Sequence, residues 1–425
     1  MTTRLSHRLT FMLSSTGFAV VLLLGFALTT GGVAHAQTLT TLYTFTGGTD
    51  GALANNGLIH DNAGNLYGTT AYGGDLTCSE GIIPPGCGVV FKFNKSGLTV
   101  LHAFTGAPDG QEPNGLPLYS GGNLYGTTSY GGANGGCSLN NAGCGTVYEL
   151  NASGKEIAQY SFKGGSDAAI PFTGVTQNLS GELFGTGYFG GANNDGAVFE
   201  LKFNAQGGSK EVVLHSFTGG SDGANPDSTP VLYSGSVYGT TTYGGGGSCN
   251  NGFATGCGVV YRITSSSESV VHSFSGPDGS YPGFLMPAAG GNFYGATGQG
   301  GSEGNGTVFE MSTTGAITTL YSFAGGNPGG DPGGLVEDSQ GNLFGTTYIN
   351  GAKGAGVIFE LSPNRQGGYT ESVLYTFTGG ADGNGPQPGI VLDENTHTLY
   401  GVTLGGGNLS CDAGYGCGTI WKLTY

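Results

Sequence analysis

Acidic residues recur in one kind of turn, and regularly spaced carboxylates are the first candidates for chemistry. Seven segments place an acid, usually as Asp-Gly, in a turn after an aromatic residue: Asp50, Asp109, Asp167, Asp222, Asp278, Asp331 and Asp382. An Asp in such a turn accepts hydrogen bonds from backbone N–H groups, and we expect this structural role. The alternative is calcium, which prefers oxygen ligands, as the one cofactor to consider; its candidates are Asp50, Asp109, Asp222, Asp278 and Asp382.

Histidine gives no clear indication of catalysis. His102, His215 and His272 share one repeat position with tyrosines of the other repeats, which indicates a packing role. His60 and His397 depart from this pattern but have no obvious nucleophile or acid partner in the sequence.

The eight cysteines form four local pairs in one structural place, the Gly-rich loop after a predicted second strand. The pairs are Cys78 with Cys87, Cys137 with Cys144, Cys249 with Cys257, and Cys411 with Cys417. Three further repeats lack both cysteines. This usage predicts four loop disulfides in an oxidising compartment, since a metal site would need four converging ligands.

Aromatic residues distinguish one half of the repeats from the other. Four consecutive repeats carry an aromatic directly after the second strand: Tyr72, Tyr130, Phe189 (with Tyr188 beside it) and Tyr243. The next three have Gln299, Ile349 and Gly405 there. We call the aromatic residues the half-ring and expect it on the face that holds the acidic turns. Such a platform would suit sugar rings; the alternative is that these rings cover Gly-rich backbone.

These residues are carried by seven repeats of roughly 50–60 residues. The repeats begin with an aromatic strand that ends at Phe45, Phe104, Phe162, Phe217, Phe274, Phe323 and Phe377. Each repeat contains four short strands separated by turn residues, as in Asn65–Thr70 and Val89–Phe93. The prediction is an all-β, seven-bladed β-propeller with four-stranded blades, and a β-solenoid is the main alternative. We place the repeats at 38–96, 97–154, 155–208, 209–266, 267–315, 316–368 and 369–425.

The two ends of this region predict how the ring closes. The region starts with a lone outermost strand, Leu39 to Phe45, and ends with a lone copy of its partner, Gly418 to Thr424. Pairing the two would remove two exposed sheet edges, so we expect the N-terminal strand to complete the last blade.

The repeat motif resembles a known family. Units of the form FTGG-x-DG, GNLYGTT-x-YGG and G-x-VFEL are similar to the GloVer (Gloeo/Verruco) tandem repeats of secreted bacterial proteins, over the whole region after residue 36. The resemblance implies the fold and export. It implies no activity.

Residues 1–36 are predicted to be a signal peptide. Arg4 and Arg8 precede an apolar stretch from Gly17 to Leu28, and Ala34-His35-Ala36 is a cleavage signal. We therefore expect a secreted or periplasmic protein, a single propeller over 37–425, and no membrane insertion after cleavage. The chain has 28 acidic and 12 basic residues, a net charge of −16, which disfavours nucleic acid and anionic membranes as partners. We further expect a monomer.

The functional expectation is a non-enzymatic scaffold that binds an extracellular polysaccharide or another cell-surface component. The alternative is a glycan-active enzyme. A lyase would use a cation such as Lys163 or Arg262, and a hydrolase would need carboxylates such as Glu303, Glu337 and Glu394 to converge. A calcium-dependent, lactonase-like hydrolase would need acids on the central axis.

Overall fold

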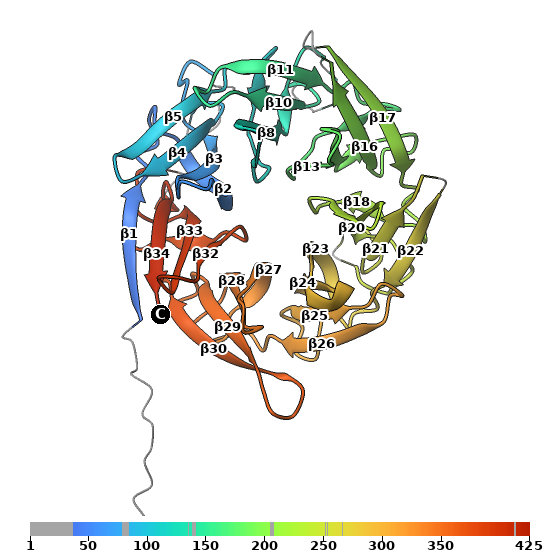
Figure 1. Ribbon diagram of the computed structural model, residues 1–425, viewed down its shortest axis with the longest axis vertical. Helices are drawn as coiled ribbons and strands as arrows, with labels where there is room; N and C mark the ends of the chain where they lie inside the picture. The colour runs from blue at the N-terminus through green and yellow to red at the C-terminus, as the bar shows by residue number, and fades with distance from the viewer. Residues whose placement is uncertain are drawn as a thin grey trace, which may run out of the picture. The chain divides into compact units, whose positions relative to one another are not determined.

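The computed structural model contains a ring of seven antiparallel β-blades (Figure 1). It describes residues 37–78, 85–134, 136–137, 142–204, 208–250, 252, 254–265, 267–411 and 414–425, and residues 37–425 form one compact unit. The predicted signal peptide lies outside the described residues. Helical structure within them is limited to short 3₁₀ segments such as η1 (Ala289–Gly291), and no helix there is long and apolar enough to span a membrane. The fold is thus the predicted all-β, seven-bladed propeller.

Three blades have an unbroken innermost strand. From the axis outward, blade 1 contains β2 (Ala52–His60), β3 (Leu66–Tyr72), β4 (Val89–Asn94) and β5 (Gly97–Ala103). Blade 5 contains β23 (Ser280–Pro287), β24 (Phe293–Gln299), β25 (Thr307–Met311) and β26 (Ile317–Ser322). Blade 6 contains β27 (Gly330–Glu337), β28 (Leu343–Ile349), β29 (Val357–Pro363) and β30 (Tyr369–Thr376).

In the other blades the innermost strand is broken into two pieces. Blade 2 contains β6 (Gly110–Gln111), β7 (Leu118–Ser120), β8 (Asn123–Thr128) with β9 (Tyr130–Gly131), β10 (Thr146–Leu150) and β11 (Glu156–Ser161). Blade 3 contains β12 (Ala168–Ala169), β13 (Thr176–Gln177), β14 (Leu183–Gly187) with β15 (Phe189–Gly190), β16 (Ala197–Phe203) and β17 (Ser209–Ser216). Blade 4 contains β18 (Ala224–Pro226), β19 (Val231–Tyr233), β20 (Ser236–Tyr243), β21 (Val259–Ile263) and β22 (Glu268–Ser273).

Blade 7 is built from both ends of the propeller. It contains β31 (Asn384–Pro386), β32 (Val391–Asp393), β33 (Thr398–Gly405), β34 (Thr419–Thr424) and, as its outermost strand, β1 (Thr38–Thr44). Strand β1 runs antiparallel to β34, with Thr38 opposite Thr424 and Thr44 opposite Thr419. The expected closure by the two orphan strands is confirmed.

The hydrophobic core lies between the blades rather than inside any one of them. In blade 1, Val89 and Phe91 of β4 pack toward blade 7, while Val90 packs toward blade 2, so the third strand is buried on both faces. This explains why the third strands are continuous apolar runs, as in other sheets that are covered on both sides. Each of the seven interfaces has one such cluster.

One packing unit within these clusters accounts for much of the repeat motif. The buried Phe that ends each outer strand contacts an aromatic ring on the third strand of the next blade, as Phe323 contacts Phe359 at 5.1 Å between ring centroids. The glycine of the Tyr-Gly-Thr or Phe-Gly-Thr motif makes room for that ring: a Cβ on Gly345 would lie 2.5 Å from Cζ of Phe359. The recurring Phe, Gly and third-strand aromatic are therefore parts of a single interlock between blades.

One hydrogen bond between the inner part of a blade and the preceding blade recurs at all seven interfaces. The residue three positions after the acidic turn position adopts φ between +51° and +63° in every blade, and its N–H donates to a carbonyl of the preceding blade. These residues, which we call the rim residues, are Leu53, Glu112, Ile170, Asn225, Tyr281, Asp331 and Gly385. In the four interfaces with a disulfide, the acceptor is the second cysteine of the pair. A repeated backbone thus carries side chains that differ at every position.

Candidate functional site

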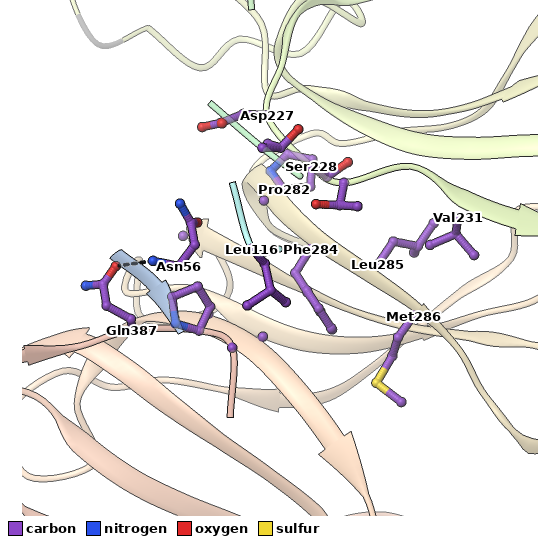
Figure 2. Close-up of a pocket in the computed structure, with 18 of the residues that line it drawn as sticks. Asn56, Leu116, Asp227, Ser228, Val231, Pro282, Phe284, Leu285, Met286 and Gln387 are labelled. Atoms are coloured by element: carbon purple, nitrogen blue, oxygen red, sulfur yellow. Dashed lines mark hydrogen bonds between the residues drawn. The ribbon is translucent and has the colours of Figure 1, made fainter. Parts of the chain in front are cut away.

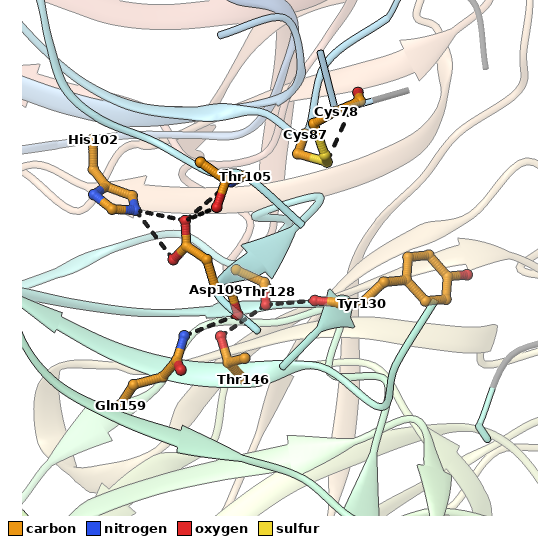
Figure 3. A network of polar contacts seen from close by, with 9 residues as sticks. All are labelled: Cys78, Cys87, His102, Thr105, Asp109, Thr128, Tyr130, Thr146 and Gln159. Carbon is orange, nitrogen blue, oxygen red and sulfur yellow. Dashed lines mark hydrogen bonds and ion pairs between the residues drawn. A yellow bond between two sulfur atoms is a disulfide. The ribbon is translucent and has the colours of Figure 1, made fainter. Parts of the chain in front are cut away.

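Six of the acidic turns use their carboxylate to hold the turn itself. In each of them the backbone N–H that follows the buried Phe donates to the acid, and the hydroxyl or imidazole two residues before that Phe also contacts it. Asp109, for example, accepts from the N–H of Thr105 at 3.0 Å and lies 3.2 Å from Nε2 of His102 (Figure 3). The equivalent acids are Asp50, Asp167, Asp222, Asp278 and Asp382. Calcium binding by these turns stays a prediction.

The histidines and tyrosines that alternate at one repeat position perform the same task. His102, His215 and His272 contact a turn acid through Nε2, and the hydroxyl of Tyr43 donates to Asp50 at 2.9 Å in the same way. These histidines therefore lie in the structural part of the repeat, as their exchange with tyrosine indicates.

The prediction that Asp331 is a turn acid is wrong. The turn position of that repeat is occupied by Pro328, and Asp331 lies three residues further on, in β27, as a rim residue with φ of +59°. This repeat has the sequence Asn-Pro-Gly-Gly-Asp where other repeats have Asp-Gly. Its Asp therefore resembles a turn acid in the sequence, although it lies three residues after the turn position. Its carboxylate therefore faces a different environment from the other six.

Carboxylate pairs form between neighbouring blades on the outer side of the ring. Glu156 of β11 lies beside Asp109 and His102, and the ligating atoms of these three side chains are within 4.8 Å of one another, which no other three His, Cys, Asp or Glu side chains in the described ranges achieve. Burial, and then the charge of Asp109, raise the pKa of Glu156 to about 7. Burial and Asp167 likewise raise the pKa of Glu211 to about 8. These acids repel one another across blade interfaces.

The structure places the half-ring beside the acidic turns, on one edge of the blades. Tyr72 pairs with Ala52, Tyr130 with Gln111, Phe189 with Ala169 and Tyr243 with Ala224, and each partner follows an acidic turn. All four rings are partly buried. Whether they contact a ligand stays a prediction.

The members of the half-ring have different surroundings. Tyr72 packs on the core between blades 7 and 1, whereas Tyr130 and Phe189 pack on the core between blades 2 and 3. Tyr243 instead lines the central cavity, where its ring lies edge-on to Tyr281 with centroids 5.4 Å apart. Tyr188 is hydrogen-bonded to Tyr243, and burial raises its pKa. The structure thus brings Tyr188, Tyr243 and Tyr281 together and keeps the other rings near their own blades.

A cavity of about 780 Å³ lies on the axis of the ring and is lined by inner strands or loops of all seven blades. Figure 2 shows Asp227 and Ser228 on one wall, Asn56 and Gln387 on another, and Phe284, Leu285 and Met286 along a third. The Gln387 Oε1 accepts from the N–H of Asn56 at 3.3 Å, which connects blades 7 and 1 across the wall. The volume is in the range of small-molecule binding sites.

Two carboxylates in this cavity have strongly altered environments. Burial raises the pKa of Asp227 to about 6 and that of Asp331 to about 6. Across the described part of the chain, no hydrogen bond or ion pair reaches either carboxylate. Both side chains keep part of their surface exposed in the cavity, so a ligand there can reach them.

Sequence reasoning missed Asp227, although a signal was present. Asp227 occupies the repeat position two residues after the rim residue, where other repeats have Asn55, Asn114, Phe172, Gly283, Gly333 and Gln387. An acid at a position without a repeated residue type is the kind of difference that marks a unique site. The innermost strands carry few aromatic or charged residues, and their contribution to the axis is visible only in the folded ring.

The residues considered for an enzyme lie elsewhere. The Nε of Arg262 donates to Ser236 Oγ at 3.1 Å, and the backbone N–H of Lys163 donates to Asp167. The carboxylates Glu303, Glu337 and Glu394 belong to blades 5, 6 and 7. None of these five residues lines the axial cavity.

Comparison with known proteins identifies the repeat and the architecture. The sequence profile of the Gloeobacter/Verrucomicrobia repeat matches residues 26–252 and 246–425. No curated protein matches the chain.

Three solved structures that match the chain at low identity are the following, and the first two of them share its fold. The extracellular domain of a protein described as a hybrid two-component system from B. thetaiotaomicron has a TM-score of 0.51 at 13% identity; the match covers 91% of this chain and 41% of that one. A puromycin-hydrolyzing peptidase from Mycobacterium tuberculosis has a TM-score of 0.50 at 10% identity, over 86% of this chain and 52% of that one. A periplasmic gluconolactonase from Pseudomonas aeruginosa has a TM-score of 0.47 at 16% identity, over 88% and 99% of the two chains. This chain spans about half or less of the first two proteins, and the likeness concerns the fold.

Proposed function

This chain belongs to the Gloeobacter/Verrucomicrobia repeat family, and we propose that its propeller is a secreted, non-enzymatic scaffold that binds an extracellular carbohydrate in the axial cavity. Four disulfides support an extracytoplasmic location, because such bonds persist in oxidising compartments. We further propose that the protein is exported to the medium or to a cell surface.

The observation that carries the proposal is the combination of rings and polar groups on the cavity wall. Tyr243 and Tyr281 present adjacent aromatic rings, and Asp227, Asn56 and Gln387 supply hydrogen-bonding groups in the same cavity. A sugar offers C–H faces to aromatic rings and hydroxyl groups to carboxylates and amides. Mostly apolar walls with a few placed polar groups are typical of small-molecule sites.

The half-ring extends this surface away from the axis. Because Tyr72, Tyr130 and Phe189 border the same edge of their blades as Tyr243, a polysaccharide that enters the cavity with one unit can lie over them with the next. Their remaining exposure is partial, so we assign them a supporting contribution and place the main contacts at Tyr243 and Tyr281.

A hydrolase is the second candidate, because Asp227 and Asp331 are two partly buried carboxylates with raised pKa values in one cavity. Glycosidases use such pairs, one of them with a raised pKa as the general acid. Incubating the protein with any polysaccharide it binds, and measuring new reducing ends, separates the two functions. A steady release that Asp227→Asn abolishes would replace the scaffold with an enzyme.

The binding proposal is tested on a glycan array, followed by calorimetric titration with the best soluble oligosaccharide. The double variant Tyr243→Ala, Tyr281→Ala is expected to weaken binding by at least about tenfold, since each aromatic contact contributes on the order of 1 kcal/mol. Tyr369→Ala, on the outermost strand β30, is the matched control and should bind like wild type. A wild-type protein that binds no glycan, or a double variant with unchanged affinity, would refute the proposal.

A further inference from the structure

The two cavity carboxylates differ from every other acid that the propeller repeats. The turn acids accept several hydrogen bonds each, whereas Asp227 and Asp331 receive none from the described residues. Both side chains are partly exposed in the cavity, so their acceptor oxygens are accessible to a ligand that carries hydrogen-bond donors. These two acids are therefore the least satisfied polar groups of the cavity.

The fold holds the carboxylate of Asp331 in place and leaves space for it. The Asp331 N–H donates to the Asn305 carbonyl at 3.0 Å, which fixes the left-handed backbone of this rim residue. In the preceding blade, Gly298 stands where other repeats have larger residues such as Tyr188, Thr242 and Tyr348. A Cβ on Gly298 would lie 2.6 Å from Oδ1 of Asp331, so the glycine provides the room that the carboxylate occupies.

Asp227 is fixed by its neighbours on the C-terminal side. The Oγ of Ser228 accepts from the Thr240 N–H at 2.9 Å, and Oγ1 of Thr229 accepts from the Gly174 N–H at 3.1 Å. Both bonds anchor the segment that carries Asp227 to surrounding strands, while the Asp227 side chain itself lines the cavity (Figure 2). The backbone that carries the Asp227 side chain is therefore held in place, which lowers the entropy cost of presenting it to a ligand.

The cavity offers no internal cation to either acid. No Lys, Arg or His stands among the described residues that line it, and the whole chain has a net charge of −16. Such a field attracts cationic ligands and repels uronates and phosphates. From this charge pattern we propose that the carbohydrate bound in the axial cavity carries protonated amines, as in oligomers of glucosamine, and that Asp227 and Asp331 receive them. The inference rests on the proposed carbohydrate binding.

The arrangement fits separated amines better than one metal ion. Asp227 belongs to blade 4 and Asp331 to blade 6, with blade 5 between them, and neither belongs to a group of three ligating side chains in the described ranges. A divalent cation would need several oxygen ligands around a single point. A chain of amino sugars instead presents one ammonium group per unit, so two carboxylates on different walls can each contact a different unit.

The test uses two ligands that differ only in the amine. The mature protein is titrated calorimetrically with the hexamer of glucosamine and with the hexamer of N-acetylglucosamine, at a pH where the amines are protonated. We expect the glucosamine hexamer to bind at least about tenfold more tightly, because hydrogen bonds to charged groups are the stronger class. Asp227→Asn and Asp331→Asn should each lower that preference, because each variant should weaken binding of the glucosamine hexamer by a larger factor than binding of the acetylated hexamer.

The controls separate a specific site from general attraction to an acidic protein. Glu303→Gln removes one negative charge outside the cavity and should leave the preference intact. Equal affinity for both hexamers, or unaltered preference in both Asp variants, overturns the amine inference and leaves carbohydrate binding standing. Equally tight binding of polylysine also overturns it, because charge alone would then suffice. If neither hexamer and no glycan on the array binds to the protein, the proposed carbohydrate-binding function itself is refuted.

Discussion

Thr41 of β1 lies directly opposite Trp421 of β34, so the first described strand of the propeller completes the sheet that its last strand leaves open. The contact continues in the side chains. Phe45, just after β1, is fully buried and packs at 5.4 Å on Phe91 of blade 1, while Trp421 packs at 5.9 Å on Phe377 of blade 6. The closing blade therefore uses the same interlock as the other interfaces, and the N-terminal strand belongs to the core.

Deleting Thr38 to Phe45 should unfold or aggregate the protein. The deletion exposes the edge of β34 and removes the buried Phe45, and the loss of a buried Phe side chain alone typically costs about 3–5 kcal/mol. Thermal unfolding and size-exclusion chromatography measure the effect, with the exposed substitution Thr40→Ala as control. A deletion variant that stays monomeric with the wild-type melting temperature would contradict closure.

Gly345→Ala should destabilise the interface between blades 5 and 6. The new Cβ would collide with Phe359, and overpacking of this kind costs about 1–3 kcal/mol. Gly283→Ala is the matched control, because its Cβ would meet no atom within 4 Å and its φ is not left-handed. Chemical denaturation of both variants gives the comparison, and equal stabilities would show that the glycine has no packing role.

The repeat fold could be predicted because the same sequence features recur in successive blades. The spacing of Phe104 and Phe162, the acidic turns and the paired cysteines each recur, so an error in one repeat is corrected by the others. The orphan strands at the two ends then determined the closure. Asp331 shows the limit of this reasoning, since a variant turn shifted its position by three residues and placed it in the wrong structural class.

The residues of the candidate site could not be predicted from the repeat pattern, because they differ between repeats and meet only in the folded ring. Asp227 and Asp331 are about one hundred residues apart, and they share a cavity only because the ring brings blades 4 and 6 to one axis. The half-ring was found from its position after the second strand, but period-2 patterning does not say that Tyr243 lines the axis while Tyr72 packs on a blade core. Those differences arise from the neighbouring rim residues.

Stability should fall as the pH rises from about 5 to about 8. The pKa of Glu211 is raised from its ordinary value of 4.5 to about 8, by burial and by Asp167, with Tyr160 also in contact. Between those values the folded protein binds more protons than the unfolded chain, so the free energy of unfolding decreases with increasing pH. Glu211→Gln should flatten this decrease and raise the melting temperature at pH 8. If Glu211→Gln and the exposed control Glu303→Gln show the same slope, the buried pair is not its source.

Loss of the Cys249–Cys257 disulfide should affect both stability and the cavity. Closing this short loop contributes on the order of 2–3 kcal/mol. The Cys257 carbonyl also accepts the N–H of Tyr281 at 2.9 Å, so a looser loop should move a ring of the cavity wall. The double variant Cys249→Ala, Cys257→Ala is expected to lose stability and ligand affinity. Cys78→Ala, Cys87→Ala should lose only stability, because the Cys87 carbonyl holds Glu112, which lies outside the cavity lining. Equal affinities in the two variants would disprove the connection.

The last prediction concerns the half-ring and asks whether its aromatic rings serve core packing, ligand binding or both. Tyr72 is hydrogen-bonded to Glu112, and Tyr130 packs on the core between blades 2 and 3, so each ring has a structural part and a partly exposed part. In the double variant Tyr72→Ala, Tyr130→Ala, we expect a loss of about 1–3 kcal/mol of stability, less than for two fully buried rings. If a polysaccharide extends from the axis over these rings, the variant should bind a long oligosaccharide several-fold more weakly and a disaccharide as wild type does. Calorimetry with both lengths, next to chemical denaturation, provides the two measurements. Unchanged affinity for the long ligand would assign the rings to packing alone, whereas a parallel loss for both lengths would show that the variant damages the axial cavity itself.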